Sequence, residues 1–290
     1  MTQNQNKNEY KNSEGHFKGS KNADLYFQLW ENPRARGTII ITHGHGELTD
    51  SYKRVVEALR DDTWSIYAWD MRGHGKSEGA RGYAASFDDY CNDYVEFLKM
   101  VLAEPSVKKG PVVLLCHSMG GLVQIKTLMQ HPEFTPDAMV VSSPLLGIGV
   151  EIPAYKKVGA EWLAKLVPKL TMWNEIGNED VTRDPEVIRE LEQDPYRHAR
   201  VCAPVYLGFL ESFKFVHERA PELKVKTLFQ ISDKDPVISS PEAIRFFEHL
   251  GSPEKDIKIY NDAKHELYND IIREQVFEDL RHFLAGVVKK

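Results

Sequence analysis

The chain has 290 residues, of which 42% are hydrophobic and 28% are charged, and its formal net charge is −6. These values fit a soluble globular protein made of one large α/β domain or two small ones. The basic residues are scattered along the chain, which argues against a nucleic-acid-binding surface, and no apolar run reaches the roughly 18 residues that cross a bilayer.

The N-terminal segment is polar and carries no apolar stretch of the kind found in secretory signals, so we expect a flexible tail over residues 1–15. Three cysteines, Cys91, Cys116 and Cys202, are far apart in the sequence and odd in number. A disulfide framework is therefore not expected, and a reducing, cytoplasmic location is favoured.

Short apolar segments and helical patterns follow in alternation. The segments GHFKG and ADLYFQLWE alternate around an SKN turn, as an antiparallel edge pair does. The next segments do not alternate, which is typical of strands buried on both faces: GTIIIT, SIYAWD, PVVLLC, AMVVSS, TLFQIS and IKIYN. Helical stripes lie between several of them, the clearest over residues 87–102 and the last over 272–283. This order predicts an α/β protein with a doubly wound, mostly parallel sheet.

Residues 147–215 interrupt the alternation with the helical segment AEWLAKLVPKL and then an acidic run. Ligands of such sheets bind at the carboxyl ends of the strands, so we predict a helical cap over the site at 147–215 and a core at 16–146 and 216–290. One helical face of the cap is apolar and comprises Trp162, Leu163, Leu166, Val167 and Leu170. This face could pack on the core, line an acyl-binding channel or contact a membrane surface.

The segment PVVLLCHSMGGLV carries the most specific signal in the chain. Its apolar run ends at Cys116 and a helix is expected to begin near Gly120, which places Ser118 on a tight turn between strand and helix. Such a turn presents a nucleophilic serine and requires small residues two positions before and after it. The first amide of the helix, that of Met119, would then face a developing oxyanion. Alternatively, Ser118 could be only the N-cap of the helix.

Two later segments each follow a predicted strand with polar residues. TLFQISDKDPVIS contains Asp233 and Asp235, and IKIYNDAKHELYND contains His265. In this class of fold the acid and the histidine follow the serine in chain order. Histidine can take the serine proton near neutral pH, and a carboxylate fixes the histidine tautomer. Loop placement favours Asp235 over Asp233, although either could be a turn residue and His265 could be a surface residue.

The segment THGHGE follows the strand GTIIIT and allows two interpretations. As metal chemistry it is similar to the T-H-x-H-x-D-H start of metallo-β-lactamase-like hydrolases, but the further Asp-His pair is missing, because the chain continues Glu47, Leu48. As a turn, its glycines let the backbone bend so that the N–H of His45 points at an oxyanion. We favour the turn, with His43 as a buried, hydrogen-bonded structural residue and with no metal.

A second GHG lies in WDMRGHGKSEG, again after a predicted strand. We interpret Asp70, Arg72, His74 and Ser77 as a hydrogen-bonded turn that braces the site rather than as chemical participants.

Taken together, these segments resemble the monoacylglycerol lipase and lysophospholipase group of α/β-hydrolases, the serine aminopeptidase-like family. The matching segments span about residues 20 to 285 and are HGHGE, DMRGHGKSEG, CHSMGG, SSPLL, TRDPEV, SDKDPVI and AKHEL. The resemblance implies an α/β-hydrolase fold with a cap over an acyl-binding channel. It also implies that Ser118, Asp235 and His265 form a catalytic triad, and that the N–H groups of His45 and Met119 form the oxyanion hole.

Three positions depart from the family pattern. Cys116 replaces the usual glycine, Asp233 stands where the family often has glycine, and His45 is bulkier than the small residue common there. The bulk of His45 could narrow the pocket.

The expected function is serine ester hydrolysis of a lipid monoester, either a monoacylglycerol or a lysophospholipid, without a cofactor. The cap could add peripheral contact with a membrane. An acyltransferase, a short-chain carboxylesterase and a non-catalytic binding module remain alternatives, and the sequence does not determine the oligomeric state.

Overall fold

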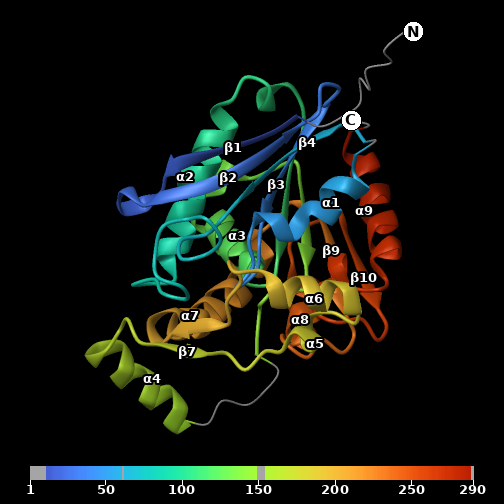
Figure 1. Cartoon of the computed structure of the whole chain (residues 1–290). Helices are drawn as coiled ribbons and strands as arrows, with labels where there is room; N and C mark the ends of the chain where they lie inside the picture. Colours follow the sequence, from blue (N-terminus) through green and yellow to red (C-terminus); the bar gives the residue numbers. More distant parts are fainter. Residues whose placement is uncertain (1–10, 61, 149–153, 289–290) are drawn as a thin grey trace.

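A computed structural model describes residues 11–60, 62–148 and 154–288 of the chain, and its centre is an eight-stranded sheet (Figure 1). The strand order is β1-β2-β4-β3-β5-β6-β9-β10. The strands are β1 (Lys11–Lys18), β2 (Asp24–Glu31), β3 (Gly37–Thr42), β4 (Trp64–Trp69), β5 (Val112–His117), β6 (Ala138–Ser142), β9 (Lys226–Ser232) and β10 (Lys255–Tyr260). β2 pairs antiparallel with β1 and β4, and the remaining pairs are parallel. The predicted α/β fold with a mostly parallel sheet is confirmed.

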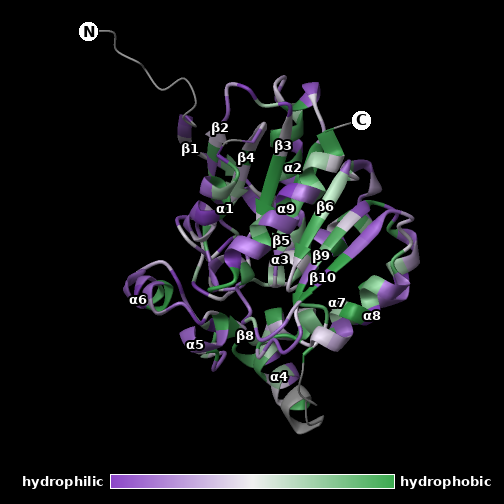
Figure 2. Ribbon diagram, turned by 90° about the vertical axis from the view of Figure 1, so that its right-hand side faces the viewer, coloured by the Kyte–Doolittle hydropathy of each residue, from purple (hydrophilic) through white to green (hydrophobic). Residues whose placement is uncertain are grey.

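Helices cover both faces of the sheet. The face that carries Ile40, Leu114 and Phe229 is packed by α2 (Asp88–Ala103), α3 (Met119–Gln130) and α8 (Ser240–His249). The face that carries Ile39 and Leu115 is packed by α1 (Lys53–Ala58) and α9 (Arg273–Val288). The side chains of successive strand residues therefore point alternately into two separate cores, which is why the central strands are apolar at nearly every position. Figure 2 shows these hydrophobic residues gathered along the central strands.

The tail predicted over residues 1–15 is too long. β1 begins at Lys11, which pairs with Glu31 of β2, so residues 11–15 belong to the sheet; residues 1–10 lie outside the described part. An edge strand needs only backbone hydrogen bonds to one neighbour, so its side chains can stay polar and exposed. In β1 only Phe17 is buried, where its ring packs against Trp69 and Phe97.

A helical insertion stands between β6 and β9, at the carboxyl ends of the parallel strands. Its elements are α4 (Ala154–Leu166), β7 (Thr171–Trp173), α5 (Asn178–Val181), α6 (Pro185–Gln193), β8 (Arg200–Cys202) and α7 (Ala203–Arg219). The predicted cap boundary at residue 215 falls inside α7, which continues to Arg219 because Phe209 and Val216 extend the core on its inner face. In the part of the chain that the structure describes, no helix is long and apolar enough to cross a membrane.

Much of the apolar cap face is exposed. The side chains of Trp162 and Leu166 are 61% and 71% exposed, and Val167 and Leu170 also face outward. α4 contacts α7 and lies at the outer edge of the molecule (Figure 1). Packing of this whole face on the core, one of the three interpretations above, is therefore wrong.

Candidate active site

Ser118 lies on a strained turn between β5 and α3. Its backbone has φ 50° and ψ −121°, a region that a residue with a side chain rarely adopts. The turn is tied down because the Ser118 N–H donates to the Ser142 carbonyl at 3.1 Å, while its own carbonyl accepts from Leu145 at 2.9 Å. Gly120 is required, because a Cβ there would lie 2.4 Å from the carbonyl oxygens of Thr42 and His43.

Cys116, which departs from the family pattern, is accommodated in the core. Its side chain is fully buried between the sheet and α3, and its Sγ lies 3.6 Å from the Val140 carbonyl oxygen. Burial raises the pKa of the Cys116 thiol, so it stays protonated and is not a nucleophile.

Asp235 and His265 form a buried hydrogen-bonded pair. The Nδ1 atom of His265 lies 2.7 Å from Oδ2 of Asp235. The other carboxylate oxygen accepts from the N–H groups of Val237 and Ile238, at 2.8 and 3.1 Å, which fixes the carboxylate plane. Burial alone raises the pKa of Asp235, but the attraction of His265 and these hydrogen bonds bring it below its ordinary value. Asp235 is therefore ionised at neutral pH.

Asp233, the competing candidate, points elsewhere. Its Oδ1 accepts from the N–H of Asp262 at 2.9 Å, and its own N–H donates to the Tyr260 carbonyl. Asp233 thus braces the loops after β9 and β10, whereas His265 pairs with Asp235.

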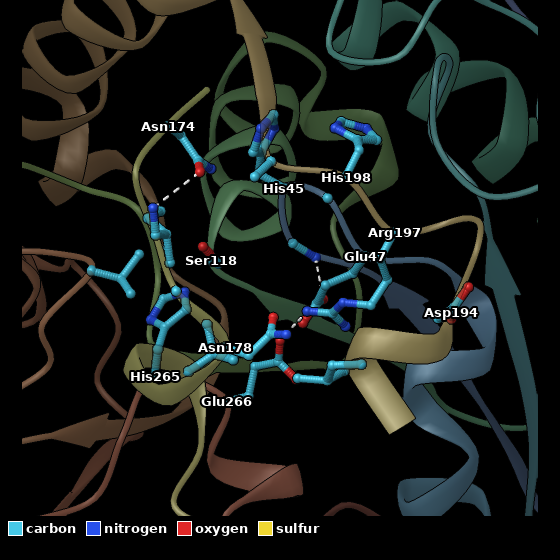
Figure 3. A pocket seen from close by; sticks show the side chains of 18 of the residues that line it. His45, Glu47, Ser118, Asn174, Asn178, Asp194, Arg197, His198, His265 and Glu266 are labelled. Atoms are coloured by element: carbon cyan, nitrogen blue, oxygen red, sulfur yellow. Dashed lines mark hydrogen bonds and ion pairs between the residues drawn. The ribbon is translucent and has the colours of Figure 1, made fainter. Parts of the chain in front are cut away.

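Ser118 and His265 line one cavity of about 450 Å³ (Figure 3). Ser118 comes from the end of β5 and His265 from the loop after β10, and the cap covers the same space with Asn174, Arg197 and His198. Asp235 contacts His265 on the ring's Nδ1 side, at the 2.7 Å distance given above. The three residues that the sequence separates by up to 147 positions are thus gathered at one edge of the sheet.

Two backbone amides lie beside the serine turn, those of Met119 and His45. Met119 is the first residue of α3, and the first amides of a helix lack partners within the helix. His45 follows β3 in a loop that touches the serine turn, since a Cβ on Gly44 would lie 3.0 Å from the Cβ of Ser118. Among the described residues, no acceptor is found for the His45 N–H. Both amides are thus available near the Ser118 hydroxyl.

The histidine-rich turn has no metal-site geometry. The ring of His43 is buried and bridges the Gly44 carbonyl at 2.6 Å and the Met71 N–H at 3.0 Å, as a structural histidine does. The rings of His45, His74 and His198 lie 4.6 to 5.6 Å from one another. Across the described ranges, no group of three or more His, Cys, Asp or Glu residues could hold a metal ion.

The second GHG turn forms the predicted brace. The carboxylate of Asp70 accepts from the N–H groups of Thr49 and Lys76, and its carbonyl accepts from the Ser77 hydroxyl. Arg72 pairs with the buried Asp93 of α2. None of these side chains lines the Ser118 cavity.

Sequence analysis missed a buried ionic network beside the site. Arg197 of the cap donates to Glu266, the residue after His265, at 2.5 Å. Glu47 accepts from the Gly44 N–H at 2.6 Å and from Tyr52 at 2.9 Å. Burial and the charge of Glu266 raise the pKa of Glu47 to about 7. Burial also acts on Glu266, but Arg197 outweighs it and lowers that pKa to about 2. The sequence offers one signal for this network: Glu47 follows the HGHG motif and Glu266 follows His265.

The fold, the strained serine and the buried acid–histidine pair define an α/β-hydrolase with the arrangement of a serine hydrolase. The comparison with known families agrees: the profile described as "Serine aminopeptidase, S33" matches residues 33–272. The chain belongs to this family and is a serine hydrolase enzyme.

Relatives of known name are similar over nearly the whole chain. Phospholipase YtpA of Bacillus subtilis is 26% identical over 255 residues, which cover 88% of this chain and 97% of the relative. A monoacylglycerol lipase of Mycolicibacterium smegmatis is 25% identical over 278 residues, covering 94% and 97%. The crystal structure of the Paleococcus ferrophilus monoacylglycerol lipase superposes with a TM-score of 0.80 at 25% identity, covering 90% of this chain and 98% of that one.

Proposed function

We propose that the protein hydrolyses carboxylic esters of lipids, with Ser118 as nucleophile, His265 as general base and Asp235 as the group that orients His265. One observation carries the proposal: the 2.7 Å contact between His265 and Asp235 at the wall of the cavity that Ser118 lines from its strained turn. A serine hydroxyl becomes nucleophilic only when a base takes its proton. The imidazole of His265 lines the same cavity as Ser118, and its pairing with Asp235 raises its pKa.

The proposed cycle has two halves. The Ser118 oxygen attacks the ester carbonyl while His265 takes the proton, and the N–H groups of His45 and Met119 hold the oxyanion. His265 then gives the proton to the leaving alcohol, and an acyl-enzyme remains. Water, activated by His265, attacks this ester and frees Ser118. Each step uses groups of this chain and needs no metal or organic cofactor.

The proposed substrates are lipid monoesters, meaning monoacylglycerols or lysophospholipids. The names of the relatives support this class, since one is a phospholipase and others are monoacylglycerol lipases. The cap adds a physical argument. Its exposed apolar side chains form a surface over α4 and β7, made of Val158, Trp162, Leu166, Val167, Leu170, Met172 and Trp173. We propose that this surface contacts the lipid phase from which a long-chain ester is drawn.

The test is hydrolysis of esters with Ser118→Ala protein beside the wild type. We expect loss of at least about a thousandfold in kcat/KM, an unchanged circular dichroism spectrum, and fluorophosphonate labelling of the wild type only. Full turnover by Ser118→Ala protein would falsify the proposal. A series of glycerol esters of rising acyl length tests the lipid class: higher kcat/KM for acetyl than for long acyl chains would contradict it.

Vesicle binding tests the membrane surface separately. Trp162→Ser/Leu166→Ser protein should bind phosphatidylcholine vesicles more weakly than the wild type in flotation assays, while a soluble short-chain ester should be hydrolysed equally well, because neither side chain lines the Ser118 cavity. The exposed Tyr196→Ser variant is the control, since Tyr196 lies outside this surface. Equal flotation of all three proteins would contradict membrane contact.

A further inference from the structure

Three histidine side chains meet where the cap rests on the core. His45 follows β3, His74 lies in the second GHG turn, and His198 belongs to the cap segment 194–202 that follows α6. We call these three residues the histidine cluster. Their ring centroids lie 4.6 to 5.6 Å apart, and Figure 3 shows the rings of His45 and His198 on the same side of the Ser118 cavity. The boundary between cap and core therefore runs through the cluster.

The hydrogen bonds of the cluster fit uncharged rings. Nδ1 of His198 accepts from the Arg200 N–H at 3.2 Å, so the ring proton is on Nε2. Nδ1 of His74 lies 3.0 Å from the Arg72 carbonyl oxygen and must donate, which leaves Nε2 of His74 as an acceptor. Both Nε2 atoms and both ring nitrogens of His45 are buried without a hydrogen bond of proper geometry. A further proton on any ring would remove an acceptor and add a buried donor and a charge.

The groups that face the cluster from the surrounding elements are neutral or positive. The rings of His43 and, in α2, Tyr90 lie 5.2 and 6.2 Å from one ring of the cluster, centroid to centroid. Arg81 and Arg197 add positive charge that acts on these imidazoles. Among the described residues, no carboxylate forms an ion pair with the cluster. The acids of the same segments accept hydrogen bonds from other groups; they are Glu47, Asp70 and Asp194.

The packed cluster therefore resists protonation. Burial, and then the neighbouring positive groups, lower the pKa of His198 to about 3, and burial lowers that of His45 to about 4. The pKa of His74 lies well below its ordinary value of 6.5 for the same reasons. An exposed histidine titrates near 6.5, so the rings take up protons only when they separate. The packed state is fully stable above pH 6.5, and each histidine weakens it about tenfold per pH unit below that value.

We propose that the histidine cluster is a pH-sensitive latch, which holds the cap segment 194–202 against the core at neutral pH and releases it in acid. Uncharged rings can pack across the boundary, whereas charged rings without a counter-charge must separate and reach water. Opening of the latch does not depend on ester hydrolysis. Its effect on the rate rests on the proposed function, because His45 and His198 line the cavity of Ser118.

Hydrogen exchange measures this opening without a substrate. Two amides cross the boundary: the His198 N–H donates to the Gly46 carbonyl at 3.3 Å, and the Cys202 N–H donates to the Gly82 carbonyl at 2.9 Å. The protection factor of each amide, its intrinsic rate divided by its observed rate, removes the pH dependence of the exchange chemistry. Between pH 6 and pH 5 these protection factors should fall by more than about tenfold, which requires more than one histidine, while the amides of β5 keep theirs.

Asparagine variants assign the protons to the cluster. In His74→Asn protein the side-chain NH₂ can still donate to the Arg72 carbonyl, and in His198→Asn protein the side-chain oxygen can still accept from the Arg200 N–H. Each substitution should remove about tenfold of the fall between pH 6 and pH 5, and the double variant should remove both contributions. His249→Asn, an exposed change in the last turn of α8, is the matched control and should keep the wild-type fall. Lost packing alone would lower protection equally at both pH values.

Three results overturn the inference: protection factors at the boundary that stay constant between pH 6 and pH 5, a wild-type fall in both single variants, or an equal fall in β5, which would mean that acid unfolds the whole protein. If the double variant fails to fold, the two single variants still decide. Failure of the proposed function is distinct, because no ester would then be hydrolysed at any pH while exchange at the boundary still responded to acid.

Discussion

The pairing of Asp235 with His265 makes a matched test possible within one loop. In Asp235→Asn protein the amide oxygen can still accept from the Val237 and Ile238 N–H groups. The amide NH₂ then faces Nδ1 of His265, where the carboxylate oxygen stood at 2.7 Å. Because NH₂ can only donate, Nδ1 becomes the acceptor and the proton of the neutral ring moves to Nε2. The nitrogen that must take the serine proton is then already protonated.

The expected loss in kcat is about 10⁴-fold, the size known for this substitution in a serine protease triad. This corresponds to about 5.5 kcal/mol of transition-state stabilisation. Asp233→Asn is the control, because Asp233 lies two residues earlier and bonds to Asp262 instead. It should lose less than about threefold, since an amide oxygen accepts the same N–H. The assay is steady-state hydrolysis of a soluble ester with thermal unfolding of each variant. A small loss for Asp235→Asn, or equal losses for both, would refute the assignment.

Three further predictions use the same assays. Burial lowers the pKa of His265, but Asp235 outweighs this and raises it above 6.5, so kcat/KM should fall with decreasing pH through a midpoint above 6.5; a rate unchanged at pH 5 would contradict the role of His265. The pKa of Glu47, about 7 in the fold against 4.5 unfolded, implies stability that is full below pH 4.5 and lost as pH rises through 7. Glu47→Gln protein should therefore be more stable than the wild type at pH 8 by up to about 3 kcal/mol, with no such gain at pH 4 in denaturant titrations. Cys116→Ala should cost about 1 kcal/mol of unfolding free energy by loss of buried packing and keep hydrolysis, whereas a catalytic thiol would lose it.

The sheet could be predicted because its central strands are buried on both faces. GTIIIT coincides with β3 at Gly37–Thr42, since every position of that strand faces one of the two cores. The edge strand β1 was predicted only from Gly15, the first residue of GHFKG. Its earlier residues are held by backbone hydrogen bonds to β2, which do not require hydrophobic side chains. The sequence also showed that one cap face is apolar, but a periodic pattern does not tell whether the face meets protein, lipid or water.

The candidate triad could be predicted for a topological reason. In a parallel sheet, the loops that follow the strands all lie at the same edge. A serine, an aspartate and a histidine that each follow a strand are therefore brought to one edge by the topology alone. No such rule connects Arg197 with Glu266, which are 69 positions apart and lie in a cap segment and a core loop. Their partnership depends on how the cap rests on the core.

The cap contacts the core through backbone atoms at two glycines of the core, Gly46 and Gly82. Gly46 has φ +76° and a Cβ there would lie 2.1 Å from the His198 carbonyl oxygen; Gly82 has φ +72° and a Cβ there would lie 2.0 Å from that of Arg200. Cys202 also donates its N–H to the Gly82 carbonyl. Gly82→Ala should therefore displace the segment that follows α6 while the Asp235–His265 pair, which does not touch it, stays in place. We expect a changed preference between substrates with fluorophosphonate labelling of Ser118 retained; loss of labelling in a folded variant would show that cap and triad are not separable.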